Sequence, residues 1–444
     1  MTGTPAQGHR AVWRLAFPII ISNISVPLLG AVDTAVVGHL PEPQHLGAVA
    51  LGAMVFNFLY WGFGFLRMGT AGLTAQAHGA GDADEVLAAG IRALLIAGLL
   101  ALVLIAGQTL IVAAAFDFLE ASAEVEASAR TYVLTRIWGA PAALGIFVIL
   151  GWFLGLQNTR ATLYVQVLMN GLNIVLDVVF VVGFGWGVGG VALATVIAEY
   201  AGFGLAVWFA LRALPGIGGR IGRDLVLAPD RLRRTLGLNT DIFVRTICLV
   251  FAFAYFTAQG ARMGDVLLAA NAVLLNFQIF MAHGLDGFAH AAQALVGRAV
   301  GARDTGALRQ AIRLSSIWAS ASAAGFALLY WIAGEGIIAL LTGIDEVRLA
   351  AAGYLAWSIV MPLISVAAYQ LDGIFLGATL GRQMRNAMIV SLAIYLGLCW
   401  ILIPAWGNHG LWFALAGFMV ARGMTLGALY GAVGRAVAVN RSLT

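Results

Sequence analysis

A few acidic, amide and hydroxyl side chains lie inside stretches of sequence that are otherwise apolar. Asp33 lies in "VPLLGAVDTAVVGHL", and Asp177 lies in "GLNIVLDVVFVVGFG". Asn173 precedes Asp177 by four residues, and Thr195 precedes Glu199 by four in "VALATVIAEY". On a helix, a spacing of four residues places both members of each pair on the same face. Grouped carboxylates, amides and hydroxyls of this kind can take up a proton or bind a cation.

The composition indicates whether these groups lie in water or in a membrane. The chain has 444 residues, of which 61% are hydrophobic and 10% are charged, and its mean hydropathy is +0.91. A soluble protein carries about 25% charged residues, so this is an integral membrane protein. The 25 basic residues are all arginines and gather near the ends of apolar runs, so the +4 net charge indicates no nucleic-acid partner. Cys248 and Cys399 lie in apolar segments and are expected to be buried.

A carboxylate at mid-membrane depth costs about 3 kcal/mol on insertion scales and is a functional candidate by default. We expect Asp33, Asn173, Asp177 and Thr195 to form a cation-coupling cluster, with Glu199 as a secondary candidate. Burial and a second carboxylate both disfavour the ionised form, so the cluster could accept a proton. Na⁺ at Asp33 and Asp177 is the alternative, because carboxylate, amide and hydroxyl oxygens suit either ion. The competing interpretation is that each group only fixes helix packing.

The apolar runs predict twelve membrane-spanning helices, because a span needs about 20 largely apolar residues. The expected spans are 11–38, 45–67, 85–114, 130–155, 160–183, 187–212, 235–258, 266–294, 306–333, 347–377, 384–404 and 409–434. Arginines concentrate in alternate loops, above all in "GIGGRIGRDLVLAPDRLRR", and the opposite loops are acidic or uncharged. By the positive-inside rule, both termini are expected to be cytoplasmic, in a multi-pass protein of the inner membrane.

The two halves of the chain resemble each other. Gly155 and Arg160 recur as Gly377 and Arg382, 222 residues later, and "HGAGDAD" (78–84) matches "RAVGARD" (298–304) at an offset of 220. Six spans per half give both halves the same orientation, as two six-helix bundles related by a pseudo-twofold axis along the membrane normal. We expect a first lobe of residues 1–212, a cytoplasmic linker of 213–234 and a second lobe of 235–444.

The second half and the first span hold further polar or helix-bending residues. Asp286 in "HGLDGFAH" and Asp372 in "YQLDGIFLG" are secondary site candidates. The alternatives are that Asp286 pairs with an arginine of an inner loop and that Asp372 is an interfacial residue at a helix end. Asp241 and Arg245, spaced by four, are expected to pair with each other. Pro18 and Pro27 interrupt the first span, and a proline inside a helix removes a backbone hydrogen bond and bends the helix. The bend is either static or changes when Asp33 is protonated.

Several segments resemble multidrug and toxic compound extrusion (MATE) transporters of the DinF-like branch. They are "VDTAVVGHL", "LDGFAHAAQALVGRAVGARD" and "YQLDGIFLGATLGRQMRNAM". The resemblance implies an all-α integral membrane protein of the MOP superfamily, with twelve helices in two lobes around a V-shaped cavity. It also implies that Asp33, Asn173, Asp177 and Thr195 couple transport to the cation and that Pro18 is the helix-1 bend. Asp372 matches the helix-10 acid of the NorM-like branch, but no convincing glutamate lies in the middle of the seventh span.

The expected activity is secondary active antiport, in which lipophilic, cationic organic compounds leave the cell in exchange for inward H⁺ or Na⁺. We expect no enzyme activity and no cofactor beyond the coupling ion, and a monomer whose partners are its small-molecule substrate and the membrane lipids. The alternative is an exporter of organic anions or lipid-linked substrates from the same superfamily. Such a protein needs cavity arginines, for which Arg130, Arg136 and Arg245 are the candidates. A major-facilitator carrier and a polytopic enzyme are disfavoured because their motifs are missing from the sequence. A channel is disfavoured because the internal repeat around two separate acidic sites favours a carrier.

Overall fold

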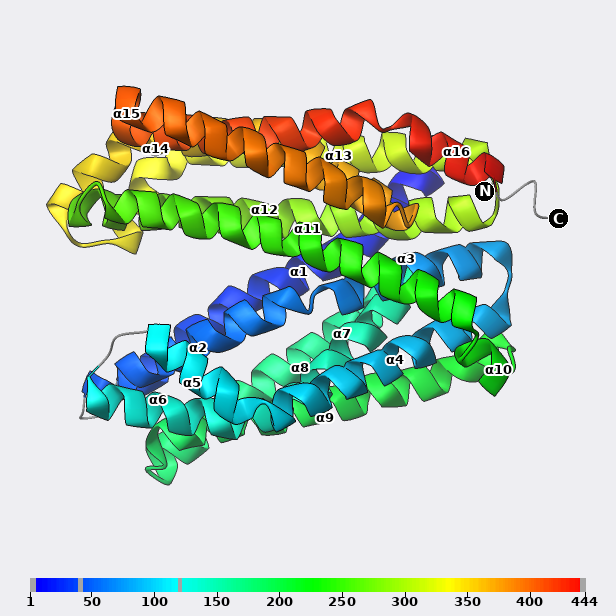
Figure 1. Ribbon diagram of the computed structural model, residues 1–444, viewed down its shortest axis with the longest axis horizontal. Helices are drawn as coiled ribbons and strands as arrows, with labels where there is room; N and C mark the ends of the chain where they lie inside the picture. The colour runs from blue at the N-terminus through cyan, green and yellow to red at the C-terminus, as the bar shows by residue number, and fades with distance from the viewer. Residues whose placement is uncertain (1–4, 39–42, 119–121, 440–444) are drawn as a thin grey trace. The chain divides into compact units, whose positions relative to one another are not determined.

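The computed structural model describes residues 5–38, 43–118 and 122–439, except for the side chains of 5–7, 26–38, 43, 44, 46, 118 and 439. Within these ranges the regular secondary structure is helical. The helices are α1 (Pro5–Gly38), α2 (Pro43–Gly62), α3 (Phe65–Ala80), α4 (Ala83–Ala106), α5 (Gln108–Phe118), α6 (Ala123–Arg136), η1 (Ile137–Gly139), α7 (Ala140–Gly155), α8 (Thr159–Asp177), η2 (Val178–Gly183), α9 (Gly187–Ile217), α10 (Arg223–Val226), α11 (Pro229–Ala261), α12 (Asp265–Gly301), α13 (Thr305–Leu341), α14 (Asp345–Gly377), α15 (Gly381–Ala428) and α16 (Gly431–Val439) (Figure 1).

Ten helical segments of the described residues are long and apolar enough to cross a membrane. The last segment, Gly381–Ala438, holds two spans, because Gly407 interrupts α15 with φ 54° and ψ −129°. A positive φ is open to glycine and strained for residues with a Cβ. Together with α1, whose second half has undescribed side chains, these segments account for the twelve spans expected from the sequence.

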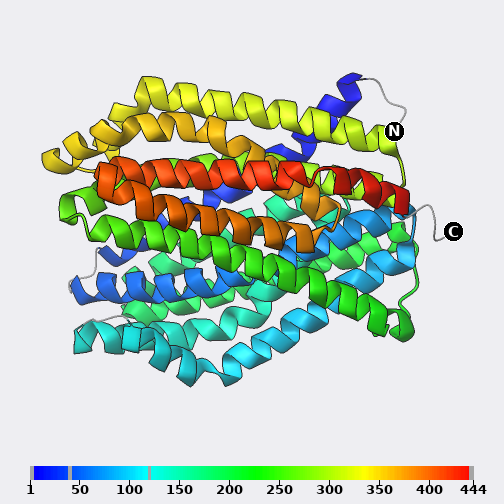
Figure 2. The same cartoon turned by 45° about the horizontal axis from the view of Figure 1, so that its top comes forward.

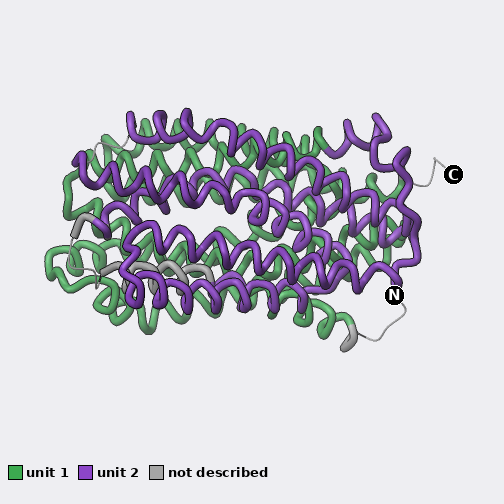
Figure 3. Tube along the Cα trace, turned by 90° about the horizontal axis from the view of Figure 1, so that it is seen from below, with its two compact units in different colours: residues 1–20, 236–444 green, residues 21–235 purple. Residues whose placement is uncertain are grey.

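The chain divides into two compact units, one of residues 21–235 and one of residues 1–20 with 236–444 (Figure 3). In the second of these, α12, α13, α14 and α15 lie along one another in both views (Figures 1 and 2). Its core includes Phe256, Phe277, Tyr395 and Trp412. The core of the unit 21–235 gathers residues of α3, α4, α7, α8 and α9 around Trp152 and Phe153.

Glycines allow the same close helix contact in each unit. A Cβ on Gly151 would lie 2.4 Å from the carbonyl oxygen of Arg67, and one on Gly373 would lie 2.1 Å from that of Ala289. The following turn repeats the contact at Gly155 and Gly377. Each residue is 222 positions from its counterpart. Small residues let membrane helices approach backbone to backbone, so the duplication seen in the sequence preserves a packing contact.

The short loops of the two units also correspond at an offset of 222. Asp82 caps α4 by accepting the backbone N–H of Glu85 at 2.9 Å, and Asp304 caps α13 by accepting that of Ala307 at 2.9 Å. The residue before each cap, Gly81 or Arg303, has a positive φ. The alignment of "HGAGDAD" with "RAVGARD" at 220 is therefore wrong, because the two capping aspartates define the register.

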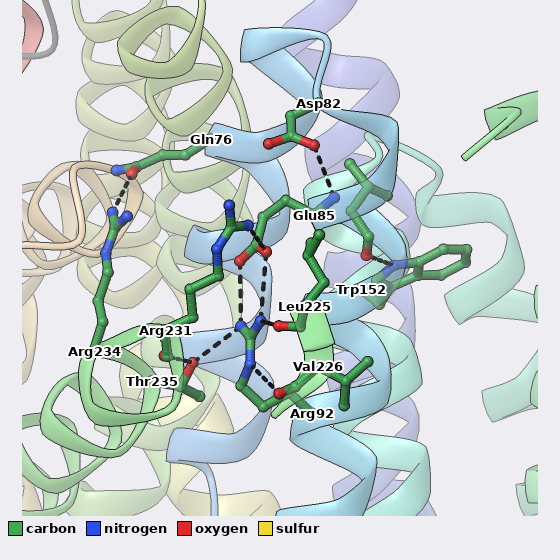
Figure 4. A network of polar contacts seen from close by, with 11 residues as sticks. Gln76, Asp82, Glu85, Arg92, Trp152, Leu225, Val226, Arg231, Arg234 and Thr235 are labelled. Carbon is green, nitrogen blue, oxygen red and sulfur yellow. Dashed lines mark hydrogen bonds and ion pairs between the residues drawn. The ribbon is translucent and has the colours of Figure 1, made fainter. Parts of the chain in front are cut away.

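The segment after α9 is held against α3 and α4 by arginine side chains (Figure 4). Arg92 is 2% exposed and donates to the carbonyl oxygens of Leu225 and Val226 at 3.0 and 3.1 Å. It also bonds Glu85 at 3.2 Å, and Glu85 is paired with Arg231 as well. Helix α10 and the first turns of α11 thus belong to the unit 21–235.

Candidate functional site

The predicted acid Asp177 lies where α8 changes its helical form. Helix α8 ends at Asp177, and the π-helix η2 follows from Val178 to Gly183. The side chain of Asp177 is fully buried, with 0% exposure. Short π-helical segments are rare and recur at functional sites. The break therefore directly follows the buried carboxylate that the sequence predicted, while the break itself could not be seen in the sequence pattern.

Asn173 and Thr195 meet one turn before Asp177. Asn173 is 1% exposed, and its Nδ2 donates to Oγ1 of Thr195 at 3.4 Å. The Thr195 hydroxyl itself donates to the carbonyl oxygen of Val191 at 3.0 Å on its own helix. This internal bond orients Thr195 Oγ1 as an acceptor toward α8. The structure thus brings together two of the four predicted coupling residues by contact and places Asp177 on the next turn of the same helix face.

The polar face of α8 continues for two further turns that the sequence analysis did not single out. Asn170 is 6% exposed and donates from Nδ2 to Oγ of Ser25 on α1 at 2.8 Å. Its Oδ1 accepts from Nε2 of Gln166 at 2.9 Å. Residues 166, 170, 173 and 177 follow the spacing of one helix face. That spacing was a usable signal, because amides are rare at this period in an apolar helix.

Two predicted site residues lie on α1. The Asp33 side chain lies outside the described part of the structure, although its backbone is helical. The α1–α8 contact at Ser25 is eight residues before Asp33, and Asn170 is seven residues before Asp177. At 1.5 Å per residue, these intervals are about 12 and about 10 Å. Pro18 is buried within an unbroken α1, near the point where the chain passes between the two units.

Glu199 pairs with an arginine one turn beyond Thr195. Its Oε1 lies 3.8 Å from Nη2 of Arg136, which belongs to the last turn of α6. Both side chains are largely buried, at 8% and 16% exposure. The pair is separate from the Asn173–Thr195 contact but shares α9 with it. Arg136 was named in the sequence analysis only as a possible anion ligand.

Two aspartates of the other unit form ion pairs with arginines of other helices. Asp372 accepts from Arg422 Nη2 at 2.6 Å and is also paired with Arg245. Asp241 pairs with Arg385 at 2.6 Å. The expected Asp241–Arg245 pair is therefore wrong, since each residue takes its partner from another helix. Asp286 is partly buried on α12.

A metal cluster is not evident among the side chains that the structure describes, where no group of three or more His, Cys, Asp or Glu residues converges. The Asp33 side chain is outside that search. Among the described side chains of the site, the Asp177 carboxylate can take up a proton, and its oxygens with Asn173 Oδ1 and Thr195 Oγ1 are of the types that bind Na⁺. Both ions therefore stay open as coupling ions.

Known proteins resemble the whole of this arrangement. The profile of the MatE family matches residues 18–179 and 242–401, one segment in each half. DNA damage-inducible protein F of Escherichia coli (strain K12) is 43% identical over 427 residues, 96% of this chain and 92% of its own length. The probable multidrug resistance protein NorM of Deinococcus radiodurans is 28% identical over 449 aligned residues, 94% of each chain.

A solved structure, described as the outward-facing conformation of a multidrug resistance MATE family transporter of the MOP superfamily, has a TM-score of 0.85. It is 19% identical and covers 99% of this chain and 97% of its own. These findings confirm the predicted all-helical membrane fold, and the relatives are transporters rather than enzymes. The chain therefore belongs to the MatE family, and its relatives include DNA damage-inducible protein F and a probable multidrug resistance protein.

Proposed function

We propose that this transporter is an antiporter that exports lipophilic organic cations in exchange for inward H⁺, with Asp33, Asn173, Asp177 and Thr195 as the coupling site. The observation that carries the proposal is the fully buried Asp177 at the α8–η2 junction, next to the Asn173–Thr195 contact. An ionised carboxylate is expensive inside a membrane protein. It is stable there when it holds a proton or lies against a cation.

Because the buried carboxylate holds either a proton or a cation, the proton and the organic cation exchange at the same site. With its carboxylates ionised, the site attracts an organic cation, and the attraction is strong because the surroundings have a low dielectric constant. Protonation from the outer side removes the attraction and releases the cation. Alternating access then returns the site inward. The register of α1 against α8, set by Ser25 and Asn170, supports the placement of Asp33 near the depth of Asp177. In this scheme Pro18 is the bend of α1 that follows the protonation of Asp33.

The arginines support a cationic rather than an anionic substrate. An exporter of anions or lipid-linked diphosphates needs guanidinium groups that are available to the ligand. The arginines considered for that role each form an ion pair with a carboxylate, as the pairs Arg130–Glu126, Arg136–Glu199 and Arg245–Asp372.

We also propose that the chain is a monomer of the inner membrane. The arginine-rich loops support a cytoplasmic position for both termini.

Transport in liposomes tests the proposal. Purified protein is reconstituted with ethidium, and a pH gradient is imposed in Na⁺-free buffer, followed by a Na⁺ gradient at constant pH. We expect transport under the pH gradient, lost in Asp33→Asn and Asp177→Asn and kept in the control Asp265→Asn, an exposed acid at the start of α12. Transport under the Na⁺ gradient alone would replace H⁺ by Na⁺. Wild-type rates in both site variants would refute the coupling site.

A further inference from the structure

Arg136, in the interior of the unit 21–235, is surrounded by aromatic rings. Its guanidinium carbon lies 4.8 Å from the ring centroid of Phe56, 5.8 Å from that of Tyr132 and 6.0 Å from that of Tyr60. A cation is attracted to the face of an aromatic ring within about 6 Å of its centroid. Phe56 and Tyr60 also contact each other, with centroids 5.3 Å apart. Phe56, Tyr60 and Tyr132, from α2 and α6, thus form an aromatic cage around a positive charge.

Glu199 lies against this cage as a carboxylate. Its distance of 3.8 Å from Arg136 is longer than a hydrogen bond. A Cβ on Gly139 would lie 2.1 Å from Glu199 Oε2, so the absence of a side chain at Gly139 provides the space for the carboxylate. Gly139 closes the 3₁₀ segment η1, which interrupts the span between α6 and α7. The hydroxyl of Tyr200 donates to the carbonyl oxygen of Trp138 in this break, at 3.0 Å.

The polar atoms of this group are incompletely paired. Among the described residues, Nε of Arg136, Oε2 of Glu199 and the hydroxyl of Tyr60 have no hydrogen-bond partner. Arg136 has one side-chain hydrogen bond, from Nη1 to the Tyr132 hydroxyl at 3.0 Å. Buried ion pairs that serve stability need their remaining donors and acceptors satisfied. Arg136 is therefore held by one hydrogen bond, by ring faces and by a carboxylate beyond hydrogen-bond distance.

We propose that Phe56, Tyr60, Tyr132 and Glu199 form a binding subsite for the positively charged end of a flat organic cation, and that the Arg136 guanidinium is its resident occupant. Ring faces with a nearby carboxylate are the chemistry that recognises organic ammonium groups. A substrate binds by displacing the guanidinium, which is planar and cationic like the expected ligand. The inference rests on the proposed function in one respect, the positive charge of the transported compound.

The subsite lies close to the proposed coupling residues. Glu199 follows Thr195 by one turn of α9, about 6 Å along the helix axis, and Thr195 accepts from Asn173. Helices α8 and α9 follow each other after a short turn and run antiparallel, so Asp177 lies one turn from this contact in the opposite direction, about 12 Å from Glu199 along the helix axis. Charges still interact over such a distance where the dielectric constant is low. Substrate and coupling ion consequently oppose each other's binding, which is the requirement for exchange.

Removing the resident occupant tests the inference. Binding of ethidium to the purified full-length protein in detergent is measured by fluorescence anisotropy. We expect Arg136→Gln to bind ethidium about tenfold more tightly than wild type, because the competitor is gone and the cage is empty. Adding Phe56→Leu or Glu199→Gln to this variant is expected to abolish the gain. Arg136→Lys, which keeps the charge without the planar group, is expected to give a smaller gain of about threefold.

The matched control is Arg130→Gln, which removes the same charge from the same helix at a surface pair with Glu126. For a neutral probe, N-phenyl-1-naphthylamine, adding Glu199→Gln to Arg136→Gln is expected to leave the binding affinity unchanged, because the carboxylate attracts only a cation. If neither Arg136→Gln nor Arg136→Lys binds ethidium more tightly than Arg130→Gln does, or if the gain survives Phe56→Leu, the subsite is refuted. When wild-type liposomes still transport ethidium in that case, the proposed function stands. A wild type that transports ethidium under neither gradient refutes the proposed function separately.

Discussion

Asp372 on α14 and Arg422 on α15 form a buried ion pair, with 2.6 Å between Oδ2 and Nη2. Arg245 on α11 shares the same carboxylate oxygen. The three charges join three helices of one unit, and Arg422 is only 2% exposed. A carboxylate that faces two guanidinium groups is poorly suited to attract a further cation. We therefore assign Asp372 a structural role in the second lobe rather than a role in coupling.

This assignment predicts the behaviour of Asp372→Asn. Two buried guanidinium groups would lose their counter-charge, which costs about 3–5 kcal/mol. We expect a lower melting temperature in detergent. Ethidium transport by the folded variant is expected to depend on the pH gradient as in wild type. The control is Asp345→Asn, whose partner Arg348 is at 3.5 Å and whose side chain is 95% exposed. An Asp372→Asn protein of normal stability that transports without the gradient would show that Asp372 is a coupling residue.

The Asn173–Thr195 contact predicts a hydroxyl requirement at position 195. Thr195→Val keeps the shape but removes the acceptor for Asn173 Nδ2, and a buried donor left without a partner costs about 1–3 kcal/mol. We expect the rate of pH-driven ethidium transport to fall about tenfold. Thr195→Ser restores the hydroxyl and is expected to recover most of the rate. Equal rates in the valine and serine variants would mean that the hydroxyl has no role.

Glycine contacts predict which glycines the fold requires. Gly373→Ala would place a Cβ 2.1 Å from the Ala289 carbonyl oxygen, and Gly151→Ala would place one 2.4 Å from that of Arg67. Because these neighbours are backbone atoms, the helices must separate, and overpacking of this kind costs about 1–3 kcal/mol. We expect both variants to have a lower melting temperature than wild type when thermal unfolding is measured in detergent. Gly397→Ala has no neighbour within 4 Å and serves as the control; the explanation fails if it destabilises equally.

Arg92 predicts the protease sensitivity of the segment after α9. It holds the carbonyl oxygens of Leu225 and Val226, and hydrogen bonds from charged groups contribute about 1.5–3 kcal/mol. In Arg92→Gln we expect trypsin to cleave this arginine-rich segment at least about tenfold faster, as followed by mass spectrometry. Arg160→Gln, at an exposed position on α8, is expected to leave cleavage unchanged. Unchanged cleavage in Arg92→Gln would show that the segment is held by other contacts.

The sequence was sufficient for features that depend on local spacing or on apolar length. The spans, the duplication and the one-turn spacing of Asn173 and Asp177 are of this kind. It was insufficient where partners come from distant helices. Arg136 and Glu199 are 63 residues apart, so only tertiary packing brings them together. The π-helix after Asp177 has no distinctive composition, because valines and phenylalanine suit an α-helix equally well in an apolar span.

Pro18 provides the test of whether α1 must bend during transport. A proline in a helix interior costs about 3 kcal/mol relative to alanine, because its ring clashes with the preceding turn and it has no N–H to donate. If the bend is static, Pro18→Ala raises the melting temperature and leaves the transport rate unchanged. If the bend alternates, the added stability favours the straight helix, and pH-driven ethidium transport slows several-fold while ethidium binding persists.

We expect the second outcome for Pro18→Ala. Pro362→Ala is the matched control, since Pro362 is also a buried proline inside an apolar helix, α14. Its replacement is expected to raise the melting temperature without slowing transport. The comparison separates a general effect of stiffening from a specific one, because both variants gain a backbone donor but only α1 carries Asp33. Slowing in both variants would mean that the loss of flexibility anywhere limits transport, and the role given to Pro18 would then be wrong.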